Sequence, residues 1–76
     1  MKHGPIGFSL HARARMAQRS ITLREVMIVV KGGRRVAEAA PAGASPRWRY
    51  SGAVDGRRIT VIAVDEPDAL VVITAY

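Results

Sequence analysis

Arginine supplies ten of the twelve basic side chains in this 76-residue chain and is the residue type best suited to carry its chemistry. A guanidinium group holds phosphate oxygens in a planar fork and keeps its charge at physiological pH. A cluster of arginines on one surface would therefore favour a site for a phosphodiester backbone, with RNA as the leading ligand. Taken singly, most of these arginines are better explained as solubilising surface residues, so the argument depends on their clustering.

A second set of candidate residues lies in the segment from Ser9 to Arg19. His11, Arg15 and Arg19 are four residues apart, so in a helix they form one stripe. A neutral histidine can accept a proton near pH 7, which makes His11 a candidate general base. The alternative is that His11 caps or packs the start of the helix and that the arginines are merely solvated.

The composition fits a basic binding surface and excludes several kinds of site. The net charge is +6 and the isoelectric point is near 11.2, a range typical of nucleic-acid-binding domains. Cysteine is absent, which excludes disulfides, thiolate metal sites and a cysteine nucleophile. We expect no metal site, because the acidic residues from Asp55 onward fall in turns without a nearby histidine.

The length indicates a single domain over residues 1–76, in which residues 1–8 are expected to be a loose N-terminal segment. A domain of this size buries roughly 60% of the surface of its unfolded chain. The apolar runs are too short to span a bilayer, and the N-terminus lacks the apolar stretch of a signal peptide. We therefore expect a cytoplasmic protein with no membrane partner.

Two helices are expected first. Ser9 is a good N-cap for a helix that ends near Arg19 and is rich in alanine and arginine. Thr22 followed by Glu25 gives the capping-box pattern for a second helix. This helix should end at Gly32-Gly33, where glycine can supply a left-handed C-terminal residue.

Strands are expected over residues 34–38, 47–54, 57–64 and 69–76, which alternate in polarity or are rich in Val, Ile and Thr. Asp55-Gly56 favours a two-residue hairpin, and the segment 65–68 favours a longer turn. The order predicts an α+β domain in which two N-terminal helices cover one face of a three- to four-stranded antiparallel sheet.

Hairpin loop lengths then predict which residues face each other across the sheet. The expected pairs are Val54 with Arg57, Ser51 with Thr60, Val64 with Leu70, Thr60 with Thr74 and Arg58 with Tyr76. Alternation places a polar set on one face: Arg47, Arg49, Ser51, Arg58, Thr60, Thr74 and Tyr76. It places the expected core on the other: Trp48, Tyr50, Val54, Ile59, Val61, Ala63, Val71, Ile73 and Ala75.

The polar face has no acidic side chain among its expected members. Uncompensated positive charge suits a polyanion, although one solvated face is also ordinary for an antiparallel sheet. Trp48 and Tyr50 are expected to point into the core, which leaves few aromatic platforms for bases. The pattern therefore favours phosphate clamping over base stacking.

The segment SLHARARMAQRSI, residues 9–21, resembles the opening helix of a small family of bacterial domains of unknown function with the pattern H-x-x-x-R-M-x-x-R-x-I. The segments GRRITVI and VITAY, residues 56–62 and 72–76, resemble its last two strands. That family is grouped with the barnase, EndoU, colicin and RelE-like superfamily, whose members are mostly metal-independent ribonucleases. The resemblance implies a RelE-like α+β domain.

The resemblance also implies roles for residues that match the family's pattern. His11 and Arg15 fall on the helix motif, Arg58 on the basic position of the penultimate strand, and Thr74 and Tyr76 on polar positions of the last strand. In related ribonucleases such groups help the ribose 2′-hydroxyl attack the adjacent phosphate without a metal or other cofactor. This implies His11 as base or acid, Arg15 and Arg58 as phosphate clamps, and Tyr76 as leaving-group acid or stacking partner. Further RNA contacts are then expected from Arg19, Arg47, Arg49, Ser51 and Thr60.

The implied function is a metal-independent endoribonuclease, the toxin of a toxin–antitoxin pair, which would act on RNA or ribosome-bound mRNA and bind a protein antitoxin. One eligible histidine and no carboxylate on the polar face leave no ordinary acid–base pair, so a slow, ribosome-assisted or inactive ribonuclease is also open. Two other classes stay open as well: a non-catalytic nucleic-acid-binding module and a protein-interaction domain.

Overall fold

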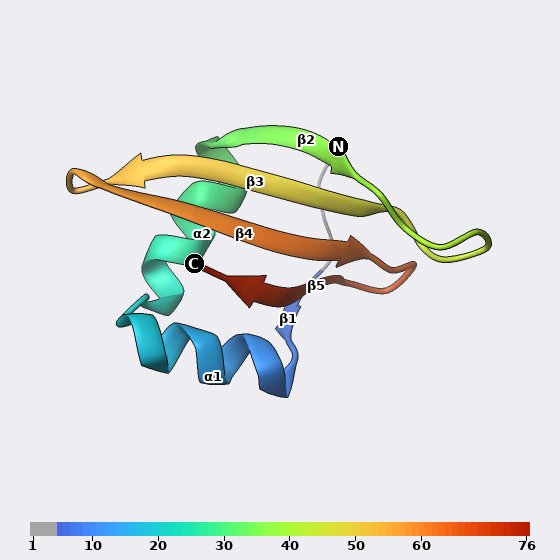
Figure 1. The fold of residues 1–76 in the computed structure, drawn as a ribbon, viewed down its shortest axis with the longest axis horizontal. Helices are drawn as coiled ribbons and strands as arrows, with labels where there is room; N and C mark the ends of the chain where they lie inside the picture. Colours follow the sequence, from blue (N-terminus) through green and yellow to red (C-terminus); the bar gives the residue numbers. More distant parts are fainter. Residues whose placement is uncertain (1–4) are drawn as a thin grey trace.

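The computed structural model describes residues 5–76, which form two helices and a five-stranded sheet (Figure 1). In chain order the elements are β1 (Ile6–Phe8), α1 (Leu10–Arg19), α2 (Leu23–Gly32), β2 (Arg34–Glu38), β3 (Arg47–Val54), β4 (Arg57–Asp65) and β5 (Leu70–Ala75). The strand order in the sheet is β1-β5-β4-β3-β2. β1 runs parallel to β5 and the other pairs are antiparallel, so the fold is α+β with a mixed sheet.

The strand β1 lies within the segment that was expected to be loose, and it adds a strand to the expected three or four. It pairs with the first half of β5, and the Leu70 N–H donates to the Pro5 carbonyl at 3.0 Å. The side chains of Ile6 and Phe8 pack against the core. The sheet therefore has five strands rather than three or four. Residues 1–4, the remainder of the segment expected to be loose, lie outside the described residues.

The helix starts are confirmed. The Ser9 hydroxyl accepts the Ala12 N–H at 3.0 Å, and Thr22 and Glu25 form the predicted capping box.

Within residues 5–76 no helix is long and apolar enough to cross a membrane.

The end of α2 lies where predicted, but not for the predicted reason. Gly33 has φ −82, so it is extended rather than left-handed. Glycine is needed there because a Cβ would lie 2.5 Å from the Val29 carbonyl oxygen and 2.6 Å from that of Ser51.

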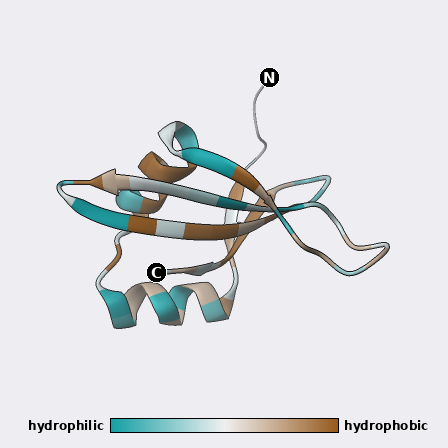
Figure 2. Cartoon of the chain, turned by 45° about the horizontal axis from the view of Figure 1, so that its top comes forward, coloured by the Kyte–Doolittle hydropathy of each residue, from teal (hydrophilic) through white to brown (hydrophobic). Residues whose placement is uncertain are grey.

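The core lies between the sheet and the two helices. α2 packs on β3 and β4, whereas α1 lies along β5 (Figure 1). Figure 2 shows hydrophobic segments in the strands and in α2, while α1 is mostly hydrophilic or intermediate. The buried cluster consists of Ala12, Ile21, Val26, Val29, Val30, Tyr50, Val54, Ile59, Val61, Ala63, Leu70, Val72 and Ala75.

The hairpin between β3 and β4 has the predicted turn and register. Asp55 and Gly56 have φ values of 53 and 81, which suit a tight two-residue turn. Val54 lies opposite Arg57, and each following pair is as predicted. The side of the sheet that faces away from the helices, here called the outer face, therefore carries Arg47, Arg49, Ser51, Arg58 and Thr60.

The pairing of β4 with β5 differs from the prediction. Thr60 exchanges two backbone hydrogen bonds with Tyr76, at 2.7 and 2.8 Å, instead of facing Thr74. Thr74 lies opposite Ile62. Thr74 and Tyr76 nevertheless stay on the outer face, because their partners have moved by two positions and alternation has a period of two.

An irregularity in β5 reverses the sides of its first half. Ala63 pairs with Val72 while Ile62 pairs with Thr74, so Ile73 is an extra residue in a β-bulge. Leu70 and Val72 are buried, with 2% and 0% exposure, and Val71 faces outward. The prediction that Val71 and Ile73 belong to the core is therefore wrong. A bulge inserts one residue without any change in the polarity pattern, so alternation alone does not reveal it.

Candidate functional site

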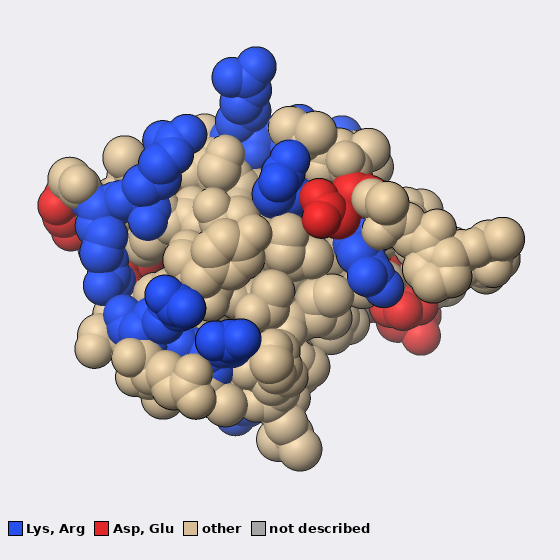
Figure 3. Space-filling model, in the orientation of Figure 1, with Lys and Arg blue, Asp and Glu red and all other residues tan. Residues whose placement is uncertain are grey.

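The outer face is basic at its rim and uncharged at its centre. In the view of Figure 1 α2 passes behind β3 and β4, so the same orientation in Figure 3 displays the outer face. Basic side chains lie at the left and above an uncharged middle, and acidic side chains are also visible at the right. The centre includes Ile62, which is 7% exposed and lies between its cross-strand partners Arg49 and Thr74. The face is therefore less uniformly polar than the predicted set of residues suggested.

One acidic side chain lies on this face, contrary to expectation. Glu38 of β2 pairs with Arg47, and its Oε1 atom is 3.7 Å from Arg49 Nε. Residues 39–46 do not form a short hairpin turn that would set the register of β2 against β3. The sequence therefore did not indicate which side chains of β2 lie on the outer face. Glu38 therefore offsets positive charge at the end of β2, next to the start of β3. Arg57 and Arg58 lie at the start of β4, at the opposite end of these strands.

An open cleft of about 510 Å³ lies where the end of α1 meets the start of β4 and the end of the chain. Its lining consists of Gln18, Arg19, Ile21, Arg57, Arg58, Ile59 and Tyr76. Three residues of the predicted site, Arg19, Arg58 and Tyr76, are thus brought together from distant parts of the sequence. The lining contains three arginines and no acidic side chain.

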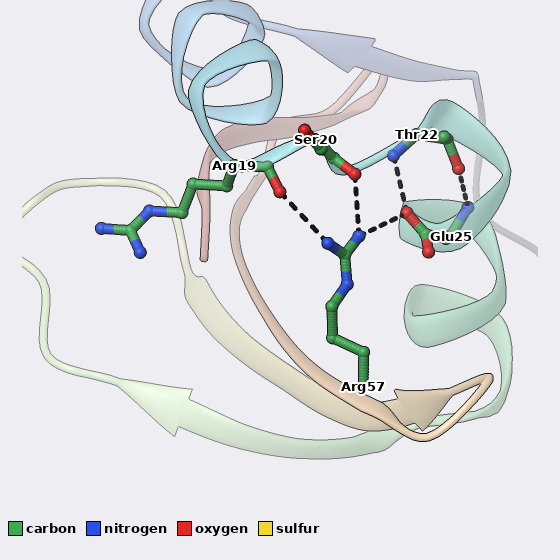
Figure 4. A network of polar contacts seen from close by, with 5 residues as sticks. All are labelled: Arg19, Ser20, Thr22, Glu25 and Arg57. Atoms are coloured by element: carbon green, nitrogen blue, oxygen red, sulfur yellow. Dashed lines mark hydrogen bonds and ion pairs between the residues drawn. The ribbon is translucent and has the colours of Figure 1, made fainter.

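The side chain of Arg57 is engaged within the protein. Its guanidinium group donates to the carbonyl oxygens of Arg19 at 3.2 Å and Ser20 at 2.8 Å, and to Glu25 Oε1 at 2.8 Å (Figure 4). Ser20 ends α1 with a left-handed φ of 56. Arg57 therefore links the carbonyl groups at the end of α1 to the Glu25 carboxylate in the first turn of α2.

Glu25 compensates the charge of Arg57. Its Oε1 atom also accepts the Thr22 N–H at 2.8 Å. This backbone hydrogen bond lowers the pKa of Glu25 below its ordinary value of 4.5, and the positive charge of Arg57 adds to the effect while desolvation opposes it. The ionised carboxylate leaves Arg19 and Arg58 as the uncompensated charges of the cleft.

Arg19 and Arg58 present their guanidinium groups to solvent. Both residues are exposed, and within residues 5–76 neither side chain forms an ion pair. Figure 4 shows the Arg19 side chain extending away from Arg57. Tyr76 is 50% exposed while its backbone is held by Thr60. Two cations and a phenol around one cleft can bind an anionic group and donate a proton to it.

His11 and Arg15 lie outside the cleft. His11 is exposed in the first turn of α1, eight residues before Arg19, which corresponds to about 12 Å along the helix axis. Neither residue lines the cleft. The predicted stripe exists on α1, but only its last member, Arg19, meets Arg58 and Tyr76. The remaining predicted residues are distributed over the outer face: Arg47, Arg49, Ser51, Thr60 and Thr74.

The DUF4258 family, described as a domain of unknown function, matches residues 8–76. The chain belongs to the DUF4258 family. This confirms the predicted membership of a small family of domains of unknown function, and the match includes all the residues of the cleft. The chain has no match among curated proteins or solved structures.

The aromatic residues of this DUF4258 chain offer little surface for stacking bases. Trp48 and Tyr50 lie on the helix side of the sheet, as predicted, and the Arg35 guanidinium carbon lies 4.0 Å from the centroid of the Trp48 ring. Burial raises the pKa of the Tyr50 hydroxyl above its ordinary value of 10.0, so this group stays protonated. Of the described aromatic side chains, only that of Tyr76 is exposed.

Sequence reasoning missed four lining residues of the DUF4258 cleft, of which two are polar, Gln18 and Arg57. Gln18 is not part of the stripe formed by His11, Arg15 and Arg19, and it lines the cleft as the neighbour of Arg19 at the end of α1. For Arg57 a signal existed: it precedes Arg58 in a strand, so it must face the helix side, where helix-end carbonyls need donors.

Within the described residues no group of three histidine or acidic side chains could hold a metal ion.

Proposed function

We propose that this DUF4258 domain binds the phosphodiester backbone of RNA over its outer face and cleaves it in the cleft without a metal ion. The observation that carries the proposal is the meeting of Arg19 and Arg58, two exposed guanidinium groups, beside Tyr76 in a cleft without an acidic lining residue. Planar, permanently charged donors suit the oxygens of a phosphodiester.

The proposed reaction is an attack of the ribose 2′-hydroxyl on the adjacent phosphorus. The bond from phosphorus to the 5′-oxygen breaks, which leaves a 2′,3′-cyclic phosphate and a 5′-hydroxyl. Arg19 and Arg58 stabilise the charge that develops on the phosphate oxygens, and the Tyr76 hydroxyl donates a proton to the leaving oxygen. The neighbouring backbone contacts residues along α1 and the outer face: Arg15, Arg47, Arg49, Ser51, Thr60 and Thr74.

The proton of the 2′-hydroxyl has no strong acceptor in the cleft. Neither a histidine nor a carboxylate is among the lining residues, and His11 lies about 12 Å from Arg19 along α1. In this proposal His11 contacts a neighbouring nucleotide, and water accepts the proton unless a ribosome supplies a better base. Turnover is therefore expected to be slow on free RNA.

Membership of the RelE-like ribonuclease superfamily and a role as a toxin extend this proposal. Their support is the arrangement of two helices on one face of the sheet together with the motif residues His11, Arg15, Arg58 and Tyr76. The partner would be a protein antitoxin. Growth arrest on expression in bacteria, relieved by the product of a neighbouring reading frame, would support this role, and unaffected growth would contradict it.

Incubation of the purified protein with RNA in excess chelator tests the reaction. Cleavage should persist, leave 2′,3′-cyclic ends and fail when the 2′-hydroxyl is replaced by hydrogen. Tyr76→Phe should lower the rate by about 10²-fold with little change in binding, as loss of a general acid usually does. His11→Ala should lower it less, and Arg58→Ala should weaken both cleavage and binding. Arg24→Ala, on the exposed surface of α2, is the matched control and should change neither.

A non-catalytic RNA-binding module is the second candidate, because the cleft lacks a base. This function predicts RNA binding that Arg58→Ala weakens, with no cleavage by the wild-type protein whether or not ribosomes are present. Absence of RNA binding at low salt would contradict both candidates.

A further inference from the structure

The strand β2 forms one edge of the sheet. Within residues 5–76 it pairs with β3 alone, and its other edge carries no strand. Its first four residues are exposed, and Val36 has 43% of its surface accessible. Unpaired backbone donors and acceptors along such an edge can pair with another strand.

The sequence of β2, Arg-Arg-Val-Ala-Glu, is complementary to itself when two copies run antiparallel. If Val36 lies opposite Val36 of a second copy, Arg34 of each copy faces Glu38 of the other. These three residues all lie on the outer face, because their partners in β3 are Ser51, Arg49 and Arg47. Two opposite-charge pairs would then flank an apolar contact, an arrangement that stabilises neighbouring strands.

We propose that a second copy of this chain docks on β2 in this register and joins the two sheets edge to edge. The charges select the register, because centring the pair on Arg35 would place two arginines opposite each other. A two-fold axis perpendicular to the sheet keeps both outer faces on the same side. Glu38 already lies near Arg49, and its carboxylate has enough acceptor capacity for Arg34 of the second copy as well.

The size of the contact implies a reversible dimer. A pairing of five residues per strand buries less than the roughly 1,200–2,000 Å² typical of stable complexes. We expect a dissociation constant between about 10 μM and 1 mM.

Sedimentation velocity over a concentration series tests the proposal without RNA, so its outcome is independent of the proposed function. Arg34→Glu and Glu38→Arg each place like charges opposite each other twice in the homodimer, and each should raise the dissociation constant by about tenfold or more. An equimolar mixture of the two variants restores opposite charges at both positions. The mixture should therefore dimerise about as tightly as the wild type.

Two further variants complete the test. The double variant R34E/E38R carries the swapped pair within one chain and should dimerise like the wild type. Arg24→Glu matches the charge change of R34E on α2 and should leave the dissociation constant within about twofold, with the fold of every variant checked by circular dichroism. A wild type that is monomeric at about 1 mM overturns the proposal. A wild type that does dimerise also overturns the proposal if neither the double variant nor the mixture of the two single variants restores dimerisation.

Discussion

At the scale of the residue, Arg57 and Arg58 show how strand alternation separates two identical side chains. Arg57 faces the helix side and binds Arg19, Ser20 and Glu25, whereas Arg58 faces outward with no ion pair within the described residues. Arg57 therefore stabilises the junction between the helices, whereas the Arg58 side chain is available for the proposed contact with RNA. A count of arginines in the sequence does not distinguish these roles.

Glu25→Gln should destabilise the protein in a pH-dependent way. The pKa of Glu25 is lowered in the folded chain, so its ionised form favours folding. This contribution is complete above the ordinary pKa of 4.5 and is lost as the pH falls through the lowered folded-state value. We expect the wild type to unfold at a higher temperature than Glu25→Gln from neutral pH to about pH 5, with the difference shrinking at more acidic pH.

Thermal unfolding between about pH 2 and pH 7 measures this difference. Asp68→Asn is the matched control, since Asp68 is an exposed carboxylate in the turn before β5, and its effect should stay within about 0.5 kcal/mol. A difference between wild type and Glu25→Gln that is equally large at every pH would contradict the assigned role of the ionised carboxylate.

At the scale of the element, the bulge in β5 decides which side chains enter the core. It turns Leu70 and Val72 inward while Thr74 and Tyr76 stay outward. Without it, one uninterrupted alternation would place Leu70 and Val72 on the same face as Tyr76, so it could not bury the first two and also leave Tyr76 outward. The bulge thus connects packing at one end of the strand with the cleft at the other.

Val72→Thr and Val71→Thr form a matched pair that tests this irregularity. Both changes replace a methyl group by a hydroxyl group of similar size. At Val72, which is fully buried, the hydroxyl should cost about 1–3 kcal/mol; at the outward Val71 the effect should stay within about 0.5 kcal/mol. Urea unfolding measures both. The uninterrupted alternation expected from the sequence predicts the reverse order, and that order would exclude the bulge.

At the scale of the whole molecule, the charges are arranged so that one face can attract a polyanion. Basic side chains gather at the left and above the uncharged centre of the outer face, whereas acidic side chains lie mainly at the right (Figure 3). The acidic residues Glu25 and Glu38 are each paired with an arginine, at 2.8 Å and 3.7 Å. No acidic side chain lines the cleft, so the positive charges of Arg19 and Arg58 are not cancelled there.

RNA affinity should fall steeply as salt increases, because each arginine–phosphate contact releases a condensed counterion. Arg58→Ala and Arg15→Ala should each weaken binding and reduce the slope of log affinity against log salt by about one. Fluorescence anisotropy with a labelled single-stranded RNA measures the slope, and Arg24→Ala should leave it unchanged. Affinity that does not depend on salt would contradict a phosphate-binding face.

The sequence by itself determined the features that depend on neighbouring residues. The caps at Ser9 and Thr22 and the turn at Asp55-Gly56 involve residues within three positions of each other, so their side-chain types were sufficient. The tight turn then set the faces of β3 and β4, and with them the outward positions of Arg49 and Arg58.

Only the tertiary structure decided the features that join distant segments. A three-residue strand is too short for a periodic pattern, so β1 became visible through its pairing with β5. The bulge at Ile73 has no sequence marker, and the bond from Arg57 to Glu25 spans 32 residues. The cleft exists for the same reason: Arg19, Arg58 and Tyr76 meet because burial of the core brings the end of α1 against β4 and the end of the chain.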